Sequence, residues 1–371
     1  MKRIILVILT VLLVSAIIFG GCAKPAEETP TTPTTPTTPT TPTEPTTPEV
    51  KPIEWRFASF IPPFDIYATE AKDWAKRVEE ATGGRLRMTF YFAESFVKMA
   101  GLPDAISSGT ADIGQAATSP FPGRFPLAQI FNLVMIFKSP HQAGQAAIAI
   151  INNNKELQDE YYPMKVIWYS APGPTNLITT KYPVQTMEDL KGLKLGAVGK
   201  TDILACELLG ASPVHILSGD AYQAMETGVC HGRVTDFNAA FVWKHYEVTK
   251  YRIDNINLSM LTFPTLMNIE SYNKLPEDVK EIFDELTDPV EMSKRVNYAF
   301  EGFYAESVAK VKEFDKKVGN PPFYVLPEAE HERWKETVWP LNEKWANDVE
   351  AQGLPGTKVL ADAVAFAEQY E

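Results

Sequence analysis

The sequence predicts an α/β protein with two similar lobes. Two observations carry this prediction: the order β-α-β-α-β occurs twice along the chain, and 45% of the 371 residues are apolar, which is enough for a large core. Strands that alternate with helices favour a mostly parallel sheet covered by helices. In a pair of such lobes, a ligand would lie between them at the carboxyl ends of the strands.

The first lobe is expected over residues 52–172. Its first strand alternates apolar and polar side chains, with Trp55 and Phe57 on one face, as a half-buried strand does. The helix after it carries apolar residues at helical spacing and ends at a pair of glycines. Strands are predicted at 53–59, 86–92 and 111–118, and helices at 67–81, 102–108 and 141–151.

The second lobe is expected over residues 173–262. A strand at 165–170 leads into it; further strands are predicted at 177–180, 193–198, 214–217 and 234–237, and helices at 203–209 and 222–227. The part that follows is rich in helical patterning, with one long helix at 290–318 and a helical tail over 319–371.

Residues 1–21 are typical of an export signal. Lys2 and Arg3 precede an apolar run that is short for a membrane span, and small residues follow it. The residues around Cys22 resemble a bacterial lipoprotein signal, in which the cysteine is lipidated and becomes the mature N-terminus; the alternative is an uncleaved anchor. Residues 22–51 form a Thr/Pro-rich linker that favours extended polyproline II. Both interpretations place the rest of the chain outside the cytoplasm, in the periplasm or at the cell surface.

The charge and the motifs of the chain exclude several functions. The formal net charge of −12 becomes −14 when the export signal is removed with its two basic residues, which argues against nucleic acid and anionic lipid as partners. The sequence has no nucleophile elbow, phosphate loop or dinucleotide fingerprint. His231 and His245 match no common metal-ligand spacing. We therefore expect no enzymatic activity, no cofactor and no metal.

Cys206 and Cys230 are the two thiols left once the signal is removed. In an oxidising compartment they could form a disulfide. The sequence does not give their separation, and the geometric window of a disulfide is narrow. A bridge and two buried free thiols both stay open.

Five short segments of the body form a recognisable series. They read Thr-Gly-Gly-Arg-Leu at 82–86, Ser-Gly-Thr-Ala-Asp-Ile at 108–113, Met-Glu-Asp-Leu-Lys-Gly-Leu-Lys at 187–194, Leu-Gly-Ala-Ser-Pro-Val at 209–214 and Lys-Leu-Pro-Glu-Asp-Val at 274–279. In this order and spacing they resemble the solute receptors of tripartite ATP-independent periplasmic (TRAP) transporters, which are family 7 extracellular solute-binding proteins.

The resemblance implies a two-lobed periplasmic-binding-protein-like fold, with a ligand cleft between the lobes and a long helix spanning both. Residues 263–318 would return to the first lobe and form that helix. The resemblance also implies closure over one small-molecule solute and docking on the membrane permease subunits of a TRAP-type transporter driven by an ion gradient. Some similar receptors pair through their C-terminal helices, so residues 319–371 either pair two copies or pack on the lobes.

Two positions depart from the family pattern. Most similar receptors carry an arginine at the position of Gly196, where its planar fork binds a substrate carboxylate. They also have an Asp-Gly-Gln-Glu-like turn where this chain reads His-Gly-Arg-Val at 231–234. Arg233 either supplies the missing positive charge from another wall or forms a salt bridge, for example with Asp236. The expected solute is an organic acid, or an aromatic or apolar compound if Gly196 marks a change of ligand class.

We expect ligand contacts from residues that follow the strands of both lobes. They are Ser59, Phe60, Thr118, Ser119, Tyr169, Asn176, Gly196, Arg233, Asp236 and Asn238. A set of aromatic residues also hints at an aromatic-lined pocket, although aromatic residues at strand ends are commonly core. This set is Phe60, Phe64, Trp168, Tyr169, Phe237 and Trp243. Two other functions stay open: a binding protein for an ATP-driven importer or signalling system, and a lipid-anchored hydrolase.

Overall fold

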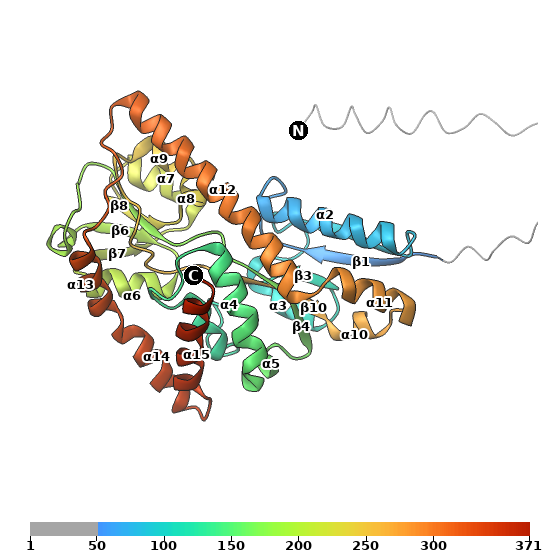
Figure 1. The fold of residues 1–371 in the computed structure, drawn as a ribbon. Coiled ribbons are helices and arrows are strands. Elements are labelled where there is room, and N and C mark those ends of the chain that lie inside the picture. The colour runs from blue at the N-terminus through green and yellow to red at the C-terminus, as the bar shows by residue number, and fades with distance from the viewer. Residues whose placement is uncertain (1–50) are drawn as a thin grey trace, which may run out of the picture. The chain divides into compact units, whose positions relative to one another are not determined.

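Two five-stranded sheets organise residues 51–371, the part of the chain that the computed structural model describes (Figure 1). The predicted export signal, Cys22 and the linker up to residue 50 lie outside the described residues. Within the described part, no helix is both long and apolar enough to cross a membrane.

The first sheet, in lobe I, has the strand order β2-β1-β3-β10-β4. β1 pairs in parallel with β2 and β3, whereas β10 is antiparallel to both of its neighbours. Apolar side chains of α2, such as Tyr67 and Trp74, pack on Trp55 and Phe57 of β1. Asp65 caps this helix by accepting a hydrogen bond from the backbone N–H of Tyr67. The strands are β1 (Ile53–Ala58), β2 (Leu86–Tyr91), β3 (Ile113–Gln115), β10 (Phe263–Asn268) and β4 (Met164–Ser170).

Helices cover both faces of this sheet. They are α2 (Ile66–Ala81), η1 (Met99–Gly101), α3 (Leu102–Ser107), η2 (Leu127–Asn132), α4 (Pro140–Asn153), α5 (Lys155–Tyr161), α10 (Ile269–Asn273) and α11 (Glu277–Leu286). α2 and α11 share one apolar cluster with β1, whereas α4 and η2 share another with β4. Lobe I therefore has a core on each face of its sheet.

The second sheet, in lobe II, has the strand order β7-β6-β8-β5-β9. β6 is parallel to β7 and β8, and β5 is antiparallel to β8 and β9. Leu195 and Val234 pack with α6, whereas Ile178, which pairs with Arg233, packs with Phe237 of α8 in a separate cluster. The elements are β5 (Asn176–Thr179), η3 (Met187–Leu190), β6 (Lys194–Ala197), α6 (Lys200–Leu208), β7 (Ser212–His215), α7 (Ser218–Glu226), β8 (Gly232–Thr235), α8 (Phe237–Val242), α9 (His245–Val248) and β9 (Tyr251–Ile253).

The chain crosses between the two sheets twice, at 171–175 and at 254–262. The two crossing segments are joined to each other, because the N–H of Thr175 donates to the carbonyl of Ser259 at 2.8 Å. The long helix α12 (Pro289–Val318) contacts α2, α4 and β4 of lobe I and α8 of lobe II (Figure 1). Its Asn297 accepts a hydrogen bond from the N–H of Ala171 at 2.9 Å and donates to the carbonyl of Tyr169 at 2.8 Å.

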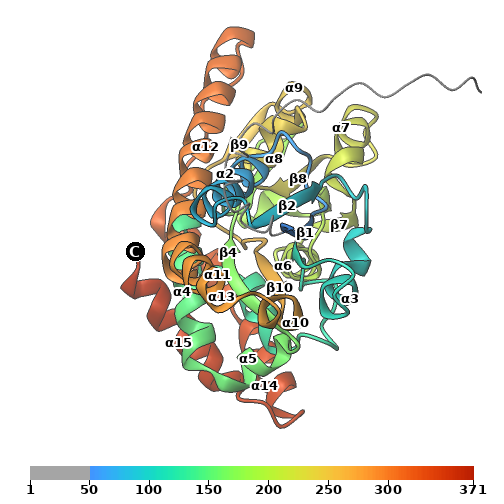
Figure 2. The ribbon, with the colours of Figure 1, turned by 90° about the vertical axis from the view of Figure 1, so that its right-hand side faces the viewer.

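Three helices form the tail: α13 (Glu328–Val338), α14 (Pro340–Glu350) and α15 (Gly356–Gln369). Trp334 of α13 packs in the lobe II core and Ala363 of α15 packs in the lobe I core. Asn342 of α14 accepts a hydrogen bond from the N–H of Val134 and donates to its carbonyl. The tail, dark red in Figures 1 and 2, thus packs along both lobes.

The structure confirms the two-lobed α/β fold, and the long helix lies one residue from its predicted start. It differs from the expectation of mostly parallel sheets, because both sheets are mixed. β10 was not predicted: Pro264 stands inside it, and proline is unusual in an inner strand. Cys206 and Cys230 are both buried and free and belong to separate apolar clusters, so the alternative of two free thiols holds.

Replacing Asn297 with Ala should destabilise the protein. The substitution leaves the N–H of Ala171 and the carbonyl of Tyr169 without their buried partner, at a cost of about 1–3 kcal/mol. Urea unfolding measures this free energy. Lys294→Ala, on an exposed position of the same helix, is the matched control. Equal stability of the two variants would contradict a role for Asn297 in holding the crossing segment.

Candidate functional site

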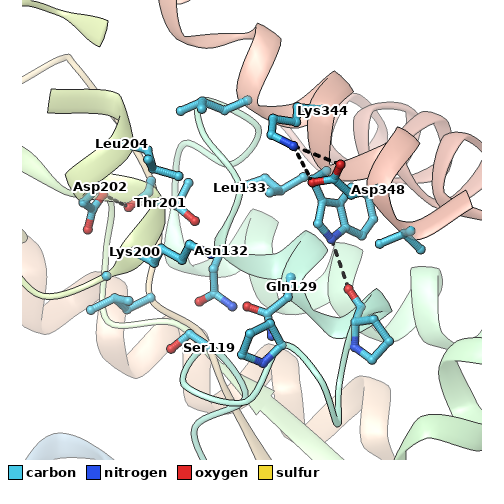
Figure 3. Close-up of a pocket in the computed structure, with 18 of the residues that line it drawn as sticks. Ser119, Gln129, Asn132, Leu133, Lys200, Thr201, Asp202, Leu204, Lys344 and Asp348 are labelled. Atoms are coloured by element: carbon cyan, nitrogen blue, oxygen red, sulfur yellow. Dashed lines mark hydrogen bonds and ion pairs between the residues drawn. The ribbon is translucent and has the colours of Figure 1, made fainter. Parts of the chain in front are cut away.

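A cavity of about 270 Å³ lies where lobe I, lobe II and α14 meet (Figure 3). Lobe I supplies the loop after β3 and η2, and lobe II supplies the first turn of α6. The second crossing segment and α14 complete the wall. The lining residues are Ser119, Pro122, Pro126, Gln129, Asn132, Leu133, Gly199, Lys200, Thr201, Asp202, Leu204, Ser259, Leu261, Leu341, Lys344, Trp345, Asp348, Val349 and Gln352.

The Nδ2 of Asn132 and the ammonium group of Lys200 face this cavity wall without a protein partner among the described residues. Asn132 is 5% exposed, and its Oδ1 accepts a hydrogen bond from the N–H of Thr262, but its Nδ2 donates to no group. Lys200 is exposed and forms no ion pair within the described chain. By contrast, Lys344 pairs with Asp348 at 2.7 Å on the α14 side. Figure 3 shows Lys200 and Asn132 between Asp202 and this ion pair.

Asp202 connects the cavity to the crossing segments. Its Oδ1 accepts a hydrogen bond from the Oγ of Ser259 at 2.5 Å, and the hydroxyl groups of Ser259 and Thr175 lie 3.1 Å apart. Burial raises the pKa of Asp202 to about 6, although the hydrogen bond from Ser259 and the charge of Arg233 oppose this rise. The first turn of α6 is thereby fixed to the strands that join the lobes.

Gly196 and Arg233 are directly opposed on neighbouring strands. β6 and β8 pair these two residues, and a Cβ atom added to Gly196 would lie 3.3 Å from the Cβ of Arg233. The two positions therefore face the same side of the sheet. Arg233 on β8 thus stands directly beside the position of Gly196 on β6.

Arg233 is buried but largely unpaired. It is 2% exposed, its Nη2 donates to the Oγ of Ser218 at 3.3 Å, and its Nε and Nη1 have no partner. Burial lowers its pKa to about 10, so the guanidinium stays charged at neutral pH. Burial also lowers the pKa of the neighbouring His245 to about 4, and the charge of Arg233 adds to this effect. A buried cation with free N–H groups is costly unless an acceptor reaches it.

Two carboxyl groups, those of Asp236 and Asp202, act on the charge of Arg233 at longer range. Asp236 caps α8 by accepting the N–H of Ala239 at 2.8 Å, and Asp65 caps α2 in lobe I. Burial raises the pKa of Asp65 to about 6, against the hydrogen bond from the N–H of Tyr67 and with a smaller contribution from the charge of Asp236, so the two carboxyl groups lie near each other across the lobes. Among the described residues, Arg233 makes no ion pair within 4 Å, so the alternative of a salt bridge with Asp236 does not hold at contact distance.

Lobe I brings a second set of predicted residues together. The Oγ of Ser59 donates to the Oε1 of Gln115 at 2.9 Å, while the Nε2 of Gln115 is buried without a partner. Phe60 packs edge-on against Phe263 at a ring distance of 5.3 Å. The loop after β3 then places Ser119 in the cavity wall.

Thr118 and Tyr169 face the interior of lobe I. The hydroxyl group of Tyr169 lies 2.9 Å from that of Tyr161, and its ring packs on Phe131 in the core. Burial raises the pKa of Tyr169 above its usual range, while the hydroxyl group of Thr118 has a smaller, opposite effect. Neither residue lines the cavity.

Asn176 and Asn238 act at the junction of the lobes. Asn176 accepts the N–H of Ile256 at 2.9 Å and donates to the hydroxyl group of Tyr304 on α12 at 3.2 Å. Asn238 donates to the carbonyl of Pro172 at 2.6 Å, and its Oδ1 is buried without a partner. These contacts tie β5 and α8 to the crossing segments.

The suggested aromatic residues do not gather around the cavity. Trp168 packs against Trp74 in the lobe I core, and Phe237 stacks on Phe323. Phe64 and Trp243 are exposed. Arg124 pairs with Asp104 at 2.5 Å on the surface of lobe I.

Several residues in and near the cavity were missed from the sequence. Gln115 and Asn132 stand in apolar stretches, where a polar residue flanked by core residues was the available signal. Lys200 and Asp202 follow Gly199 in the first turn of α6, directly after the carboxyl end of β6. Helix N-termini at such places commonly bind anions, and this was the available signal. The contribution of α14 had no sequence signal, because it depends on how the tail packs.

The model of the bacterial extracellular solute-binding proteins of family 7 matches residues 57–348, well over half of the chain. The chain belongs to this family. This family 7 protein is 23% identical over 320 residues to the C4-dicarboxylate-binding periplasmic protein DctP of Rhodobacter capsulatus, covering 83% of this chain and 91% of that protein. It is 27% identical to a solute-binding protein of Chromohalobacter salexigens, over 53% of this chain and 59% of that protein.

Solved structures agree with this assignment. A TRAP periplasmic solute-binding protein from Desulfovibrio salexigens superposes with a TM-score of 0.78 at 27% identity, covering 86% of this family 7 protein and 97% of that chain. A TRAP solute-binding protein from Rhodoferax ferrireducens, solved with copurified benzoate, gives a TM-score of 0.76 at 23% identity over 86% and 98% of the two chains. The two-lobed receptor fold is therefore shared.

Replacing Asp202 with Asn should change how stability depends on pH. The native pKa of Asp202, about 6, lies above its ordinary value of 3.8, so the native state takes up a proton first as the pH falls. Wild type should therefore lose stability relative to Asp202→Asn as the pH rises from about 4 to about 7, by on the order of 2 kcal/mol.

Urea unfolding of both proteins at several pH values measures this difference. The other acidic groups titrate in both proteins and cancel from the comparison. Asp348→Asn, at an exposed acid on α14, is the control for removing a carboxyl group that is not buried. If the difference in unfolding free energy between wild type and Asp202→Asn stays constant with pH, then ionising the buried carboxyl group does not destabilise the native state.

Proposed function

We propose that this protein is an extracytoplasmic solute-binding lipoprotein that delivers a small organic acid to a TRAP-type secondary transporter. One observation carries the choice of ligand: Arg233 is buried, charged and unpaired at Nε and Nη1, opposite Gly196. A ligand carboxylate would accept those N–H groups and neutralise the buried charge. Arg233 thus takes over the carboxylate-binding role that β6 carries in similar receptors.

The names of related proteins support an acidic ligand. Structures of similar fold are described with benzoate, with mandelate and with D-glucuronate, and one sequence relative is named for C4-dicarboxylates. Each of these compounds is a carboxylate. For this chain we accordingly favour an organic acid over a neutral aromatic compound.

Binding would act through closure of the lobes. Lobe II contributes Arg233, Asp236 and Asn238, and lobe I contributes Ser59 and Phe60, so a solute between them contacts both lobes. A solute that binds the closed form more tightly shifts the open–closed equilibrium toward it. The crossing segments and α12 form the hinge of this motion. Such a receptor binds and releases its solute unchanged, with no catalytic step and no cofactor.

The remaining assignments follow from the sequence. An export signal and lipidation at Cys22 would anchor the protein to a membrane, and the linker would hold the lobes away from the lipid surface. The lobes would then dock on the permease subunits of the transporter. Pairing of two copies stays a prediction for the tail. An ATP-driven importer as the partner is the second candidate, since the two-lobed shape serves both systems.

Replacing Arg233 with Met should abolish tight binding of carboxylates while filling most of the same volume. Truncating one partner of a buried charge pair costs about 2–5 kcal/mol, so the dissociation constant should rise by roughly 30-fold or more. Isothermal titration against a panel of organic acids measures this change, and circular dichroism checks the fold. Arg124→Ala, on the surface, is the matched control. Unchanged affinity in a folded Arg233→Met protein would remove Arg233 from the site.

Moving the guanidinium back to β6 should restore binding. In the double variant Gly196→Arg with Arg233→Gln, the arginine starts from the adjacent strand on the same face of the sheet. We expect carboxylate affinity above that of Arg233→Gln alone. Gly196→Arg alone should bind poorly, because its side chain meets Arg233. If Arg233→Gln and the double variant bind carboxylates equally weakly, an arginine on β6 cannot replace the arginine on β8, and the proposed exchange is wrong.

A further inference from the structure

We propose that the cavity beneath α14 is a second binding site, apart from Arg233, for an organic acid with an apolar body, whose carboxylate group lies at the N-terminus of α6. Neither Arg233 nor Asp236 lines this cavity. The inference goes beyond the proposed function, since it concerns a different site. Four features of the wall support it.

The start of α6 offers backbone donors. The helix begins at Lys200 after Gly199, which has no side chain to cap it, and the first N–H with an acceptor inside the turn is that of Ile203, bonded to Gly199. The N–H groups before it have no acceptor within the helix. Together with the helix dipole, such donors bind anions.

Asn132 is an independent sign of a missing acceptor. It comes from lobe I, is 95% buried and lines the cavity, and its Nδ2 has no partner in the described chain. A buried amide donor without an acceptor costs free energy. A carboxylate between Asn132 and the first turn of α6 would satisfy donors on both sides.

Lys200 supplies the charge. Its ammonium group forms no ion pair within the described chain and lies in the middle of the view of the cavity (Figure 3). Two acids also line the wall. Asp348 is paired with Lys344 at 2.7 Å, and Asp202 accepts a hydrogen bond from Ser259 at 2.5 Å while the nearby charge of Arg233 offsets its own. Lys200 is therefore the cation left for a ligand.

Apolar side chains form another part of the wall. Leu133 comes from lobe I, Leu204 from lobe II, and Trp345 with Val349 from α14, where the indole N–H of Trp345 is occupied by the carbonyl of Pro126. These side chains offer hydrophobic surface to the body of a ligand. The volume, about 270 Å³, is close to the lower limit of roughly 300 Å³ for small-molecule sites, so a compact acid fits best.

The proposed occupant would touch both lobes and α14 at once. A compound bound there would favour one relative position of the lobes. By linkage, it would change the affinity of the Arg233 site, and a solute at Arg233 would change the affinity of the cavity by the same factor.

The test uses benzoate as probe and the neutral amide benzamide as comparison, in isothermal titration of the purified protein carrying Arg233→Met. We expect millimolar or tighter benzoate binding to persist in this protein, and benzamide to bind at least about tenfold more weakly because it lacks the charge. Adding Lys200→Ala should weaken benzoate binding about tenfold. Adding Leu204→Trp, which fills the cavity from a partly exposed position, should remove it. Lys191→Ala, an exposed lysine of the same lobe, is the control.

The outcomes separate the two sites. No benzoate binding to the Arg233→Met protein, or binding that neither Lys200→Ala nor Leu204→Trp changes, overturns the second site and leaves the proposed function standing. Residual binding that both variants reduce supports the second site. If Arg233→Met leaves the tightest binding intact and Leu204→Trp removes it, the cavity is the main site and the role given to Arg233 fails. Quenching of tryptophan fluorescence by the probe should follow the same pattern, since Trp345 lines the cavity.

Discussion

The hydrogen bonds between α12 and the first crossing segment are the constraint on which the rest of the structure depends. Asn297 holds the N–H of Ala171 and the carbonyl of Tyr169 at the point where β4 ends and the chain leaves lobe I. A few residues later, Tyr304 of the same helix contacts Asn176 at the start of β5. One rigid helix thus fixes the end of one sheet and the beginning of the other, so any motion of the lobes must occur between these two contacts.

The proposed exchange between Gly196 and Arg233 would let a site keep its charge while its sequence pattern changes. Opposed residues on adjacent parallel strands project from the same face, so an arginine moved from β6 to β8 stays within one strand spacing of its former place. Glycine on β6 leaves room for the new side chain. The cost is a guanidinium group that the protein itself does not pair, which is tolerable in a receptor whose ligand brings the acceptor.

Buried acids set the electrostatic balance around this cation. Asp65 from lobe I and Asp236 from lobe II cap helices that begin near the junction of the lobes, and burial raises the pKa of both. Because like charges approach each other when the lobes are together, the positive charge of Arg233 offsets part of a repulsion that would otherwise favour separation. Asp202, which lines the cavity, is a further acid whose charge interacts with that of Arg233.

The sequence by itself determined the two-lobed α/β fold, the long helix and the family, since these depend on local periodicity and on short segments whose order is visible in one chain. The sequence also singled out Gly196 and Arg233, but it did not show that the two residues are direct neighbours on adjacent strands. Tertiary structure alone decided the rest. β10 joins lobe I through strands more than ninety residues away in the chain, and the sequence signal of its apolar residues is interrupted by Pro264. Tyr169 became a core residue and Asn132 a wall of the cavity because packing of distant segments decides which side of a strand or turn is covered. The cavity itself exists only because α14 lies across both lobes, a long-range contact that no local pattern encodes.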